Sequence, residues 1–173
     1  MHGLVMLDEY NNVIRPAILW NDTRTSKQCE NILKDFGDKI LSITKNRPLE
    51  GFTLPKILWV QENEPNLWEQ VKHIMLPKDY VVWYLTEKYS TDFSDAAGTL
   101  MLDLKNCKWS EAIIEKYKIE KMYLPSIYKS EELVGEVTDA LSLKWQLKNK
   151  VKVAAGGADN ACAALGAGIV SSE

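Results

Sequence analysis

The stretch that decides the fold is Val151–Val170, which reads VKVAAGGADNACAALGAGIV. A short β-branched run leads into Gly156 and Gly157. The pair Asp159 and Asn160 follows, and then a run of small residues with helical character. This order predicts a strand, a tight turn and a helix that begins near Asp159, because glycines adopt turn conformations that side chains forbid. The free N–H groups of the first helical turn attract anions. A carboxylate beside such an anion site is what transfer of a phosphoryl group to a hydroxyl requires.

A purely structural interpretation of the same stretch stays open. Aspartate is common at the N-termini of helices, and paired glycines are common in turns. Asn160 directly after Asp159 favours a binding site, since one polar side chain is enough for a cap and a second can hydrogen-bond a polyol.

Composition excludes several classes of protein. The chain has 173 residues, enough for one domain with a core, and 46% apolar with 26% charged residues is the balance of a soluble globular protein. A net charge of -3 without a basic stripe gives no reason to expect nucleic acid as a partner. No apolar run approaches the length of a membrane span, so we expect no membrane partner.

The three cysteines, at positions 29, 107 and 162, lie far apart and form no metal-type pair, so we predict no metal site from them. Widely spaced cysteines in odd number are typical of a reducing compartment, and there is no signal peptide. We therefore expect a cytoplasmic protein. Cys162 is expected to be a small buried packing residue rather than a nucleophile. The chain also opens as if a strand were already under way, which indicates a piece of a longer protein.

Hydrophobic periodicity and turn residues predict alternating strands and helices. The expected elements are a β-hairpin over 3–20, strands over 73–76, 100–103, 134–137 and from 151, and helices over 24–36, 53–64, 80–85, 110–118 and 138–145, with a short helix from 66. Residues 91–99 are expected to form a loop or short strand that shapes the floor of a cleft. His73 is expected at a strand edge in solvent.

Four segments, taken in order, carry a resemblance to a known family. They are Met1-His2-Gly3, Trp20–Arg24, Ser94–Thr99 and Gly156–Asn160. Each is a weak signal alone, but the series resembles the FGGY carbohydrate kinase family over essentially the whole chain. The resemblance implies an α/β fold, here a partial ribonuclease-H-like/actin-type domain with hairpin and helical insertions. Within the family, the first two motifs favour the branch that acts on D-xylulose. Kinases of gluconate, ribulose or glycerol are the alternatives.

The resemblance also implies a domain organisation. In this family the first domain holds the sugar, the second holds the adenine nucleotide, and a deep cleft lies between them. Residues 1–173 then correspond to the central and C-terminal part of the sugar-binding N-terminal domain. The first phosphate motif and the nucleotide-binding domain are absent, so we expect the fragment to be inactive alone. ATP and Mg²⁺ are implied for the intact enzyme, with none bound by this fragment, and a homodimer is one assembly the intact enzyme can adopt.

The resemblance assigns roles to individual residues. Asp159 accepts the proton of the sugar's terminal hydroxyl, whose oxygen then attacks the γ-phosphate of ATP. His2 and Asn160 hydrogen-bond sugar hydroxyls, and Met1 lines the pocket. Trp20 walls the pocket, and the alternative is that the neighbouring Asn21 and Asp22 only cap the following helix. His2 alone also fits an ordinary histidine at the end of a strand.

Gly156 and Gly157 are expected to bind the phosphates of the nucleotide. Two other classes of function are weighed against the kinase. One is a binding module that holds a polyol or a protein without chemistry. The other is a metal-dependent hydrolase that uses Asp92, Asp95 and Asp159, which is disfavoured because no histidine accompanies these carboxylates.

Overall fold

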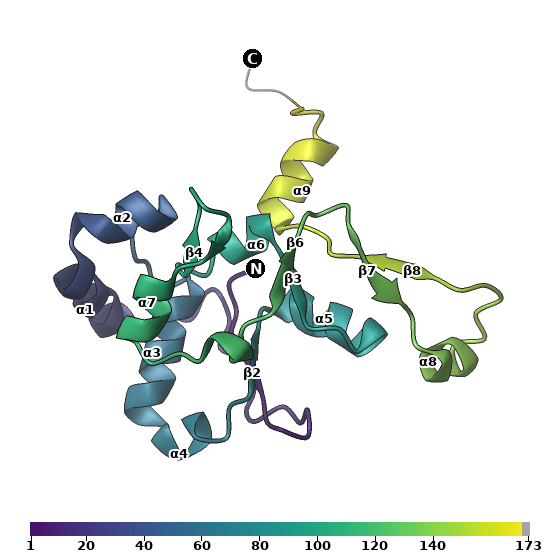
Figure 1. Ribbon diagram of the computed structural model, residues 1–173, viewed down its shortest axis with the longest axis horizontal. Helices are drawn as coiled ribbons and strands as arrows, with labels where there is room; N and C mark the ends of the chain where they lie inside the picture. The colour runs from purple at the N-terminus through teal and green to yellow at the C-terminus, as the bar shows by residue number, and fades with distance from the viewer. Residues whose placement is uncertain (171–173) are drawn as a thin grey trace.

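A computed structural model describes residues 1–170 of the chain. Figure 1 shows a broad helical body, a central region of short strands, and a narrow arm. The helices of the body are α1 (Ser26–Phe36), α2 (Asp38–Thr44), α3 (Thr53–Asn63), α4 (Pro65–Trp68) and α7 (Glu111–Lys116), followed by the 3-10 helix η1 (Lys121–Tyr123). Their apolar faces share one core, which contains Ile32, Leu54, Ile57 and Ile113. Burial of these faces supplies the main stabilisation of the body.

The strands are short and pair two at a time. The antiparallel pairs are β1 (Val5–Leu7) with β2 (His73–Met75), β4 (Leu102–Asp103) with β5 (Lys108–Trp109), and β7 (Leu133–Glu136) with β8 (Lys152–Ala154). The parallel pair is β3 (Ser90–Asp92) with β6 (Ser126–Tyr128). Strands and helices are thus mixed along the chain, and the α/β class expected from the sequence is confirmed.

Two helices of the central region begin at capped ends. Helix α5 (Pro77–Thr86) follows β2, and the Asp79 carboxylate accepts a hydrogen bond from the backbone N–H of Leu76. Helix α6 (Phe93–Ala97) follows β3 directly, and its N-cap is Asp92. Side-chain acceptors at these positions satisfy N–H groups that have no partner inside the helix. Both caps place a carboxylate in the middle of the molecule.

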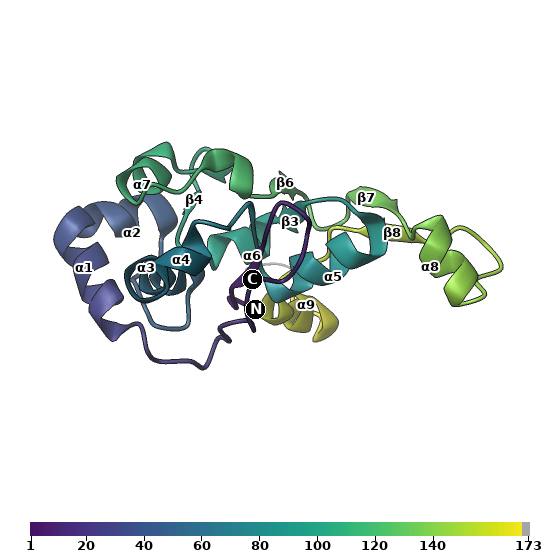
Figure 2. The ribbon, with the colours of Figure 1, turned by 90° about the horizontal axis from the view of Figure 1, so that it is seen from below.

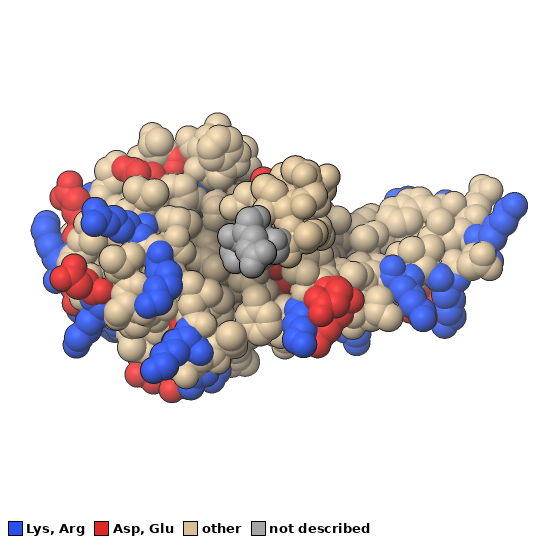
Figure 3. Space-filling model, turned by 90° about the horizontal axis from the view of Figure 1, so that it is seen from above, with Lys and Arg blue, Asp and Glu red and all other residues tan. Residues whose placement is uncertain are grey.

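The arm consists of β7, α8 (Asp139–Lys144) and β8, and the chain then enters α9 (Asp159–Gly166). Neither α8 nor α9 contains a buried residue. Figure 3 shows the arm as a narrow projection with Lys and Arg side chains toward its end. Among residues 1–170, no helix is both long and apolar enough to cross a membrane.

Most predicted elements are present, and several differences have a physical reason. The 3–20 hairpin is wrong in part: its second arm makes only the bridges Leu4–Ile18 and Leu7–Val13, and β1 forms its ladder with β2. The loop or short strand expected over 91–99 begins as strand β3 and continues as α6, because the Asp92 cap starts a helix there. Helix α2 and strand β5 were not predicted, whereas β6 lies in the extended segment expected from Leu124. His73 stacks on Tyr89 with ring centroids 3.9 Å apart, so it is not free in solvent.

Candidate functional site

His2 is held in an unusual position near α6. Its backbone φ is 53°, in the left-handed region that few non-glycine residues occupy and that is enriched at functional sites. Its Nδ1 lies 3.0 Å from the carbonyl oxygen of Gly98. A carbonyl only accepts, so Nδ1 carries the proton and donates. Nε2 of the neutral ring is then left as an acceptor.

Gly98 leaves the space in which the His2 ring sits. A Cβ added at this position would lie 2.0 Å from Cε1 of His2, far inside van der Waals contact. The ring also meets Phe52 edge-on, with centroids 5.1 Å apart. Burial is the largest influence on the pKa of His2 and lowers it below its usual value, although the Gly98 hydrogen bond and Asp95 oppose the shift. The ring is therefore neutral near pH 7.

His2 lines a hollow of about 460 Å³. The other lining residues are Trp20, Asn21, Thr23, Leu49, Glu50, Gly51 and Phe52. The hollow therefore contains two of the predicted site residues, His2 and Trp20. Trp20 is 65% exposed, and an aromatic side chain in that state offers its face to a ligand. A space of this size accommodates a small sugar.

Lys56 shapes one wall of the hollow, and sequence reasoning missed it. It is fully buried, and its ammonium donates to the carbonyls of Glu50 (2.8 Å), Gly51 and Phe52 (2.9 Å). Burial lowers the pKa of Lys56 to about 8. One feature of the sequence could have indicated its burial: Lys56 lies in a helix between apolar residues. Its three carbonyl contacts fix the loop that carries Phe52.

Capping by residues 21–23 is not observed. The N-cap of α1 is Thr25, which makes no side-chain cap. Asp22 instead accepts from the Arg24 guanidinium at 2.8 and 2.7 Å, and this guanidinium lies 4.7 Å from the centre of a Trp59 ring. The capping interpretation was wrong because the chain makes a further turn before the helix begins.

The strand, turn and helix predicted around Asp159 are present. Gly156 has φ of 80° in the turn between β8 and α9, and α9 starts at Asp159. The N-cap is Ala158, so Asp159 is not the cap that the structural interpretation required. Asp159 and Asn160 are exposed, and Asp159 Oδ1 accepts from the backbone N of Asn160 at 2.7 Å. The structure thus leaves both polar side chains at the open end of α9.

The two glycines of the turn have internal reasons to be glycine. Gly156 has a φ of 80°, which L side chains rarely adopt, and a Cβ at Gly157 would lie 3.0 Å from Sγ of Cys162. Cys162 is exposed, so its expected burial was wrong, although it does pack against the turn. Nucleotide binding by the glycines stays a prediction.

Helix α6 connects His2 with the turn before Asp159. His2 is bonded to Gly98 at the C-terminal end of α6, and near its N-terminal end the Ser94 hydroxyl accepts from the backbone N of Ala158 at 2.9 Å. A five-residue helix is only about 7.5 Å long at 1.5 Å per residue. Figures 1 and 2 both show the N-terminus of the chain near α6 and α9. Met1, which precedes His2, is partly buried.

A buried charged cluster lies beneath the turn, and sequence reasoning did not foresee it. The ammonium of Lys78 lies 2.9 Å from Asp79, 3.1 Å from Asp92 and 3.7 Å from Asp95, and it donates to the carbonyl of Ala155 at 3.0 Å. Burial raises the pKa of Asp79 to about 6 and also raises that of Asp95. Burial opposes the charge of Lys78, but the neighbouring carboxylates outweigh it and raise its pKa. The cluster thus holds one cation among three acids.

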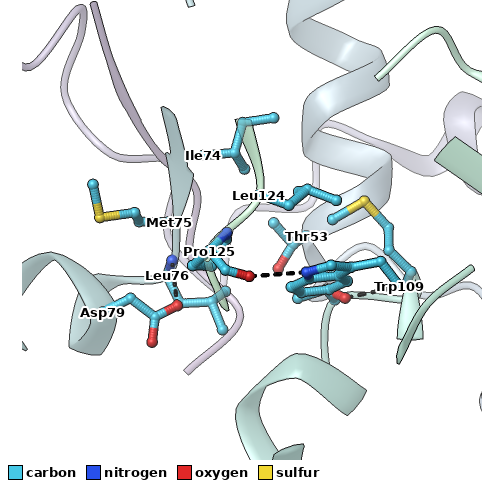
Figure 4. Close-up of a pocket in the computed structure, with 10 residues that line it drawn as sticks. Thr53, Ile74, Met75, Leu76, Asp79, Trp109, Leu124 and Pro125 are labelled. Carbon is cyan, nitrogen blue, oxygen red and sulfur yellow. Dashed lines mark hydrogen bonds between the residues drawn. The ribbon is translucent and has the colours of Figure 1, made fainter. Parts of the chain in front are cut away.

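Asp92 and Asp95 therefore converge on an ammonium, which counters their charge. Residues 1–170 contain no group of three or more His, Cys, Asp or Glu side chains arranged to hold a metal ion. Figure 4 shows Asp79 at the edge of a separate, mostly apolar cavity that also contacts Trp109. This cavity measures about 10 Å³, which is the space of a single water at most, so it is no substrate site.

Similarity to known proteins agrees with the fold described above. Residues 1–166 match the N-terminal domain of the FGGY family of carbohydrate kinases, and the chain therefore belongs to this family. It is 54% identical over 173 residues to the xylulose kinase of Lactococcus lactis subsp. lactis (strain IL1403), covering 100% of this chain and 34% of that protein. It is 51% identical over 172 residues to the xylulose kinase of Bacillus subtilis (strain 168), covering 99% and 34%.

A solved structure agrees with these relatives. The crystal structure of a xyloylose kinase from Brucella ovis superimposes with a TM-score of 0.91 at 37% identity, covering 96% of this chain and 34% of that one. The chain thus spans about a third of the length of the curated relatives it matches.

Proposed function

We propose that this chain is the sugar-binding part of a kinase that transfers the γ-phosphate of ATP to the terminal hydroxyl of D-xylulose, giving D-xylulose 5-phosphate. The observation that carries the proposal is the double attachment of α6, which bonds His2 at one end and the turn before Asp159 at the other. This attachment supports a single site made of a sugar-binding imidazole and an exposed carboxylate. Membership of the FGGY family adds independent support.

Asp159 is the proposed general base. Its exposed carboxylate is reachable by an acceptor hydroxyl, and it accepts the hydroxyl proton as the oxygen attacks. The positive end of the α9 dipole favours negative charge in front of it, although the N–H groups of Asn160 and Ala161 already have side-chain acceptors. ATP, when bound, supplies the phosphoryl group, and Gly156 and Gly157 are the residues of this chain proposed to face its phosphates. Positioning and charge stabilisation dominate such reactions.

The sugar is proposed to lie between the hollow and α9. Nε2 of the neutral His2 accepts a hydrogen bond from a sugar hydroxyl, and the Asn160 amide bonds another. Trp20 provides an apolar wall, and Met1 lines the pocket. These four side chains are uncharged, which suits recognition of a small uncharged polyol such as a ketose.

The rest of the active enzyme is proposed to come from a longer protein. Residues 1–173 correspond to the central and C-terminal part of its sugar-binding domain, and the nucleotide-binding domain supplies the contacts to ATP and Mg²⁺. On this view the fragment alone is inactive. Gluconate, ribulose and glycerol remain alternative acceptors, and a polyol- or protein-binding module without chemistry is the alternative of another class.

A chimera tests the proposal. Residues 1–173 replace the matching third of the Lactococcus lactis relative, with which they share 54% identity. Phosphorylation of D-xylulose, D-ribulose, D-gluconate and glycerol is then measured at saturating ATP, and D-xylulose is expected to have the highest kcat/KM. A higher value for another acceptor would reassign the substrate. A folded chimera that binds D-xylulose in calorimetry but phosphorylates nothing would support the binding module instead.

A further inference from the structure

Two side-chain hydrogen bonds, from α5 and α6, fasten the turn between β8 and α9, beside a backbone bond from the Gly156 N–H to the carbonyl of Ser130 at 3.1 Å. Before the paired glycines, the Lys78 ammonium donates to the carbonyl of Ala155 at 3.0 Å. After them, the backbone N–H of Ala158 donates to the hydroxyl of Ser94 at 2.9 Å. Glycine has the greatest backbone freedom of any residue. The two fastenings therefore restrain the most flexible part of the segment that carries Asp159.

One buried carboxylate joins the two fastenings. Asp92 is 0% exposed, and its Oδ1 lies 3.1 Å from the Lys78 ammonium. Its Oδ2 accepts from the backbone N of Ser94 at 2.8 Å and from the Ser94 hydroxyl. Hydrogen bonds to an ionised group are stronger and more directional than neutral ones. Asp92 thus orients the cation on one side and the hydroxyl on the other.

The direction of the Ser94 hydroxyl follows from this arrangement. A carboxylate accepts, so the hydroxyl proton points at Asp92. The lone pairs of the Ser94 oxygen are then available to Ala158, whose N–H only donates. An alanine at position 94 would leave this buried N–H without a partner. Lys78, Asp92 and Ser94 therefore form a connected network that ends on the turn at both sides.

We propose that Lys78, Asp92 and Ser94 are positioning residues for Asp159. They hold the turn so that the Asp159 carboxylate stays where an acceptor hydroxyl can reach it in line with the phosphoryl donor. The network itself touches no reacting atom. This inference rests on the proposed function of Asp159 as the general base. It differs from simple support of the fold, which would change stability without separating kcat from KM.

The test compares Ser94→Ala with the variants Ser94→Thr and Ser130→Ala, all made in the chimera. Ser94→Ala is expected to lower kcat by about 10- to 100-fold, because small displacements of a catalytic group have costs of this order. KM for D-xylulose is expected to change by less than about threefold, since the His2 ring keeps its position against Gly98. Ser94→Thr retains the hydroxyl and is expected to restore most of the lost kcat.

Ser130→Ala is the matched control. Its hydroxyl lies 3.3 Å from the same Asp92 oxygen, but the Ser130 side chain is not the acceptor for Ala158. The control is expected to keep kcat within about twofold of the parent, as substitutions away from the reacting geometry do. An equal fall in kcat for both variants would overturn the positioning role in favour of general support.

Folding and activity are separated by two further measurements. A folded Ser94→Ala chimera with unchanged kcat overturns the inference. Should that variant not fold, Ser94→Cys replaces it, because the thiol has a similar volume but is a weaker hydrogen-bonding group. Ser94→Cys must then lower kcat while leaving KM for D-xylulose nearly unchanged. A parent chimera without kinase activity would count against the proposed function. Hydrogen exchange in the 173-residue chain then tests the network: Ser94→Ala must accelerate exchange at Ala158 by about tenfold or more, and unchanged exchange overturns it.

Discussion

The two sides of the turn between β8 and α9 differ in exposure and in charge. Beneath it, Asp79, Asp92 and Asp95 are buried around the single ammonium of Lys78. Beyond it, Asp159 and the rest of α9 contain no buried residue. The proposed base is thus open to reactants, while the carboxylates beneath it are buried. If Asp159 acts as proposed, the contrast predicts that its position depends on buried groups beneath the turn.

The largest expected effect comes from removing the buried cation. Lys78→Met leaves three buried carboxylates without their counter-charge, and we expect it to lower the free energy of unfolding by about 3–5 kcal/mol. Denaturant unfolding of the chain measures this. Lys27→Met is the control: its ammonium lies 3.2 Å from Glu62 on the surface, and its loss is expected to cost less than about 1 kcal/mol. Equal costs for the two variants would remove the contrast between buried and exposed charge.

A smaller effect is expected at the seat of His2. Gly98→Ala places a methyl group where the ring lies and forces His2 out of the hollow. The displaced ring loses its hydrogen bond to the sugar, so D-xylulose affinity in the chimera should fall by about tenfold. Gly166→Ala is the control, since an added Cβ there meets no atom within 4 Å. Calorimetric titration measures both. Unchanged affinity for Gly98→Ala would place the sugar away from His2.

The smallest predicted effect is a pH dependence of sugar binding. Burial lowers the pKa of His2 in the folded chain below the usual histidine value of 6.5. The ring therefore stays neutral between pH 8 and pH 6.5 and gains a proton only at lower pH. The free energy of unfolding changes in the same direction. The unfolded chain binds the proton at a higher pH than the folded chain, so the fold loses stability as the pH drops below 6.5.

Protonation replaces the Nε2 acceptor by a donor, and D-xylulose affinity should fall by about fivefold, as for one hydrogen bond of about 1 kcal/mol. His2→Asn, which keeps an acceptor that does not titrate near neutrality, should bind with an affinity independent of pH over pH 5–8. Calorimetry of both proteins over this range makes the comparison. Affinity that rises on acidification would contradict the assigned tautomer.

The sequence predicted the parts of the fold that depend on local patterns. The strand, turn and helix around Gly156 and Asp159 follow from β-branched residues, glycines and small helix formers, and they are present. Helices α1, α3 and α5 were also predicted within a few residues at each end. Their apolar spacing and flanking Gly or Pro residues are local signals.

The buried network could not be predicted in this way. Lys78 meets Asp92 and Asp95 only because α5, β3 and α6 come together in space, and spacing along the chain does not reveal that. Lys56 likewise finds its carbonyl partners in a loop that a helical pattern does not describe. The ladder between β1 and β2 joins segments almost 70 residues apart, whereas the expected hairpin was the local solution. Long-range contacts decided the Lys78 cluster and the β1–β2 ladder, whereas the backbone path of the preceding loop decided the Lys56 contacts.

The role of Asp159 is the central claim, and kcat of the Asp159→Asn chimera tests it most directly. The amide keeps the size of the side chain but is not a base, so we expect kcat to fall by about 10²–10⁴-fold. The dissociation constant of D-xylulose should change far less. Turnover within a few-fold of the parent would contradict the account, because the exposed acid at the start of α9 would then not be the proton acceptor.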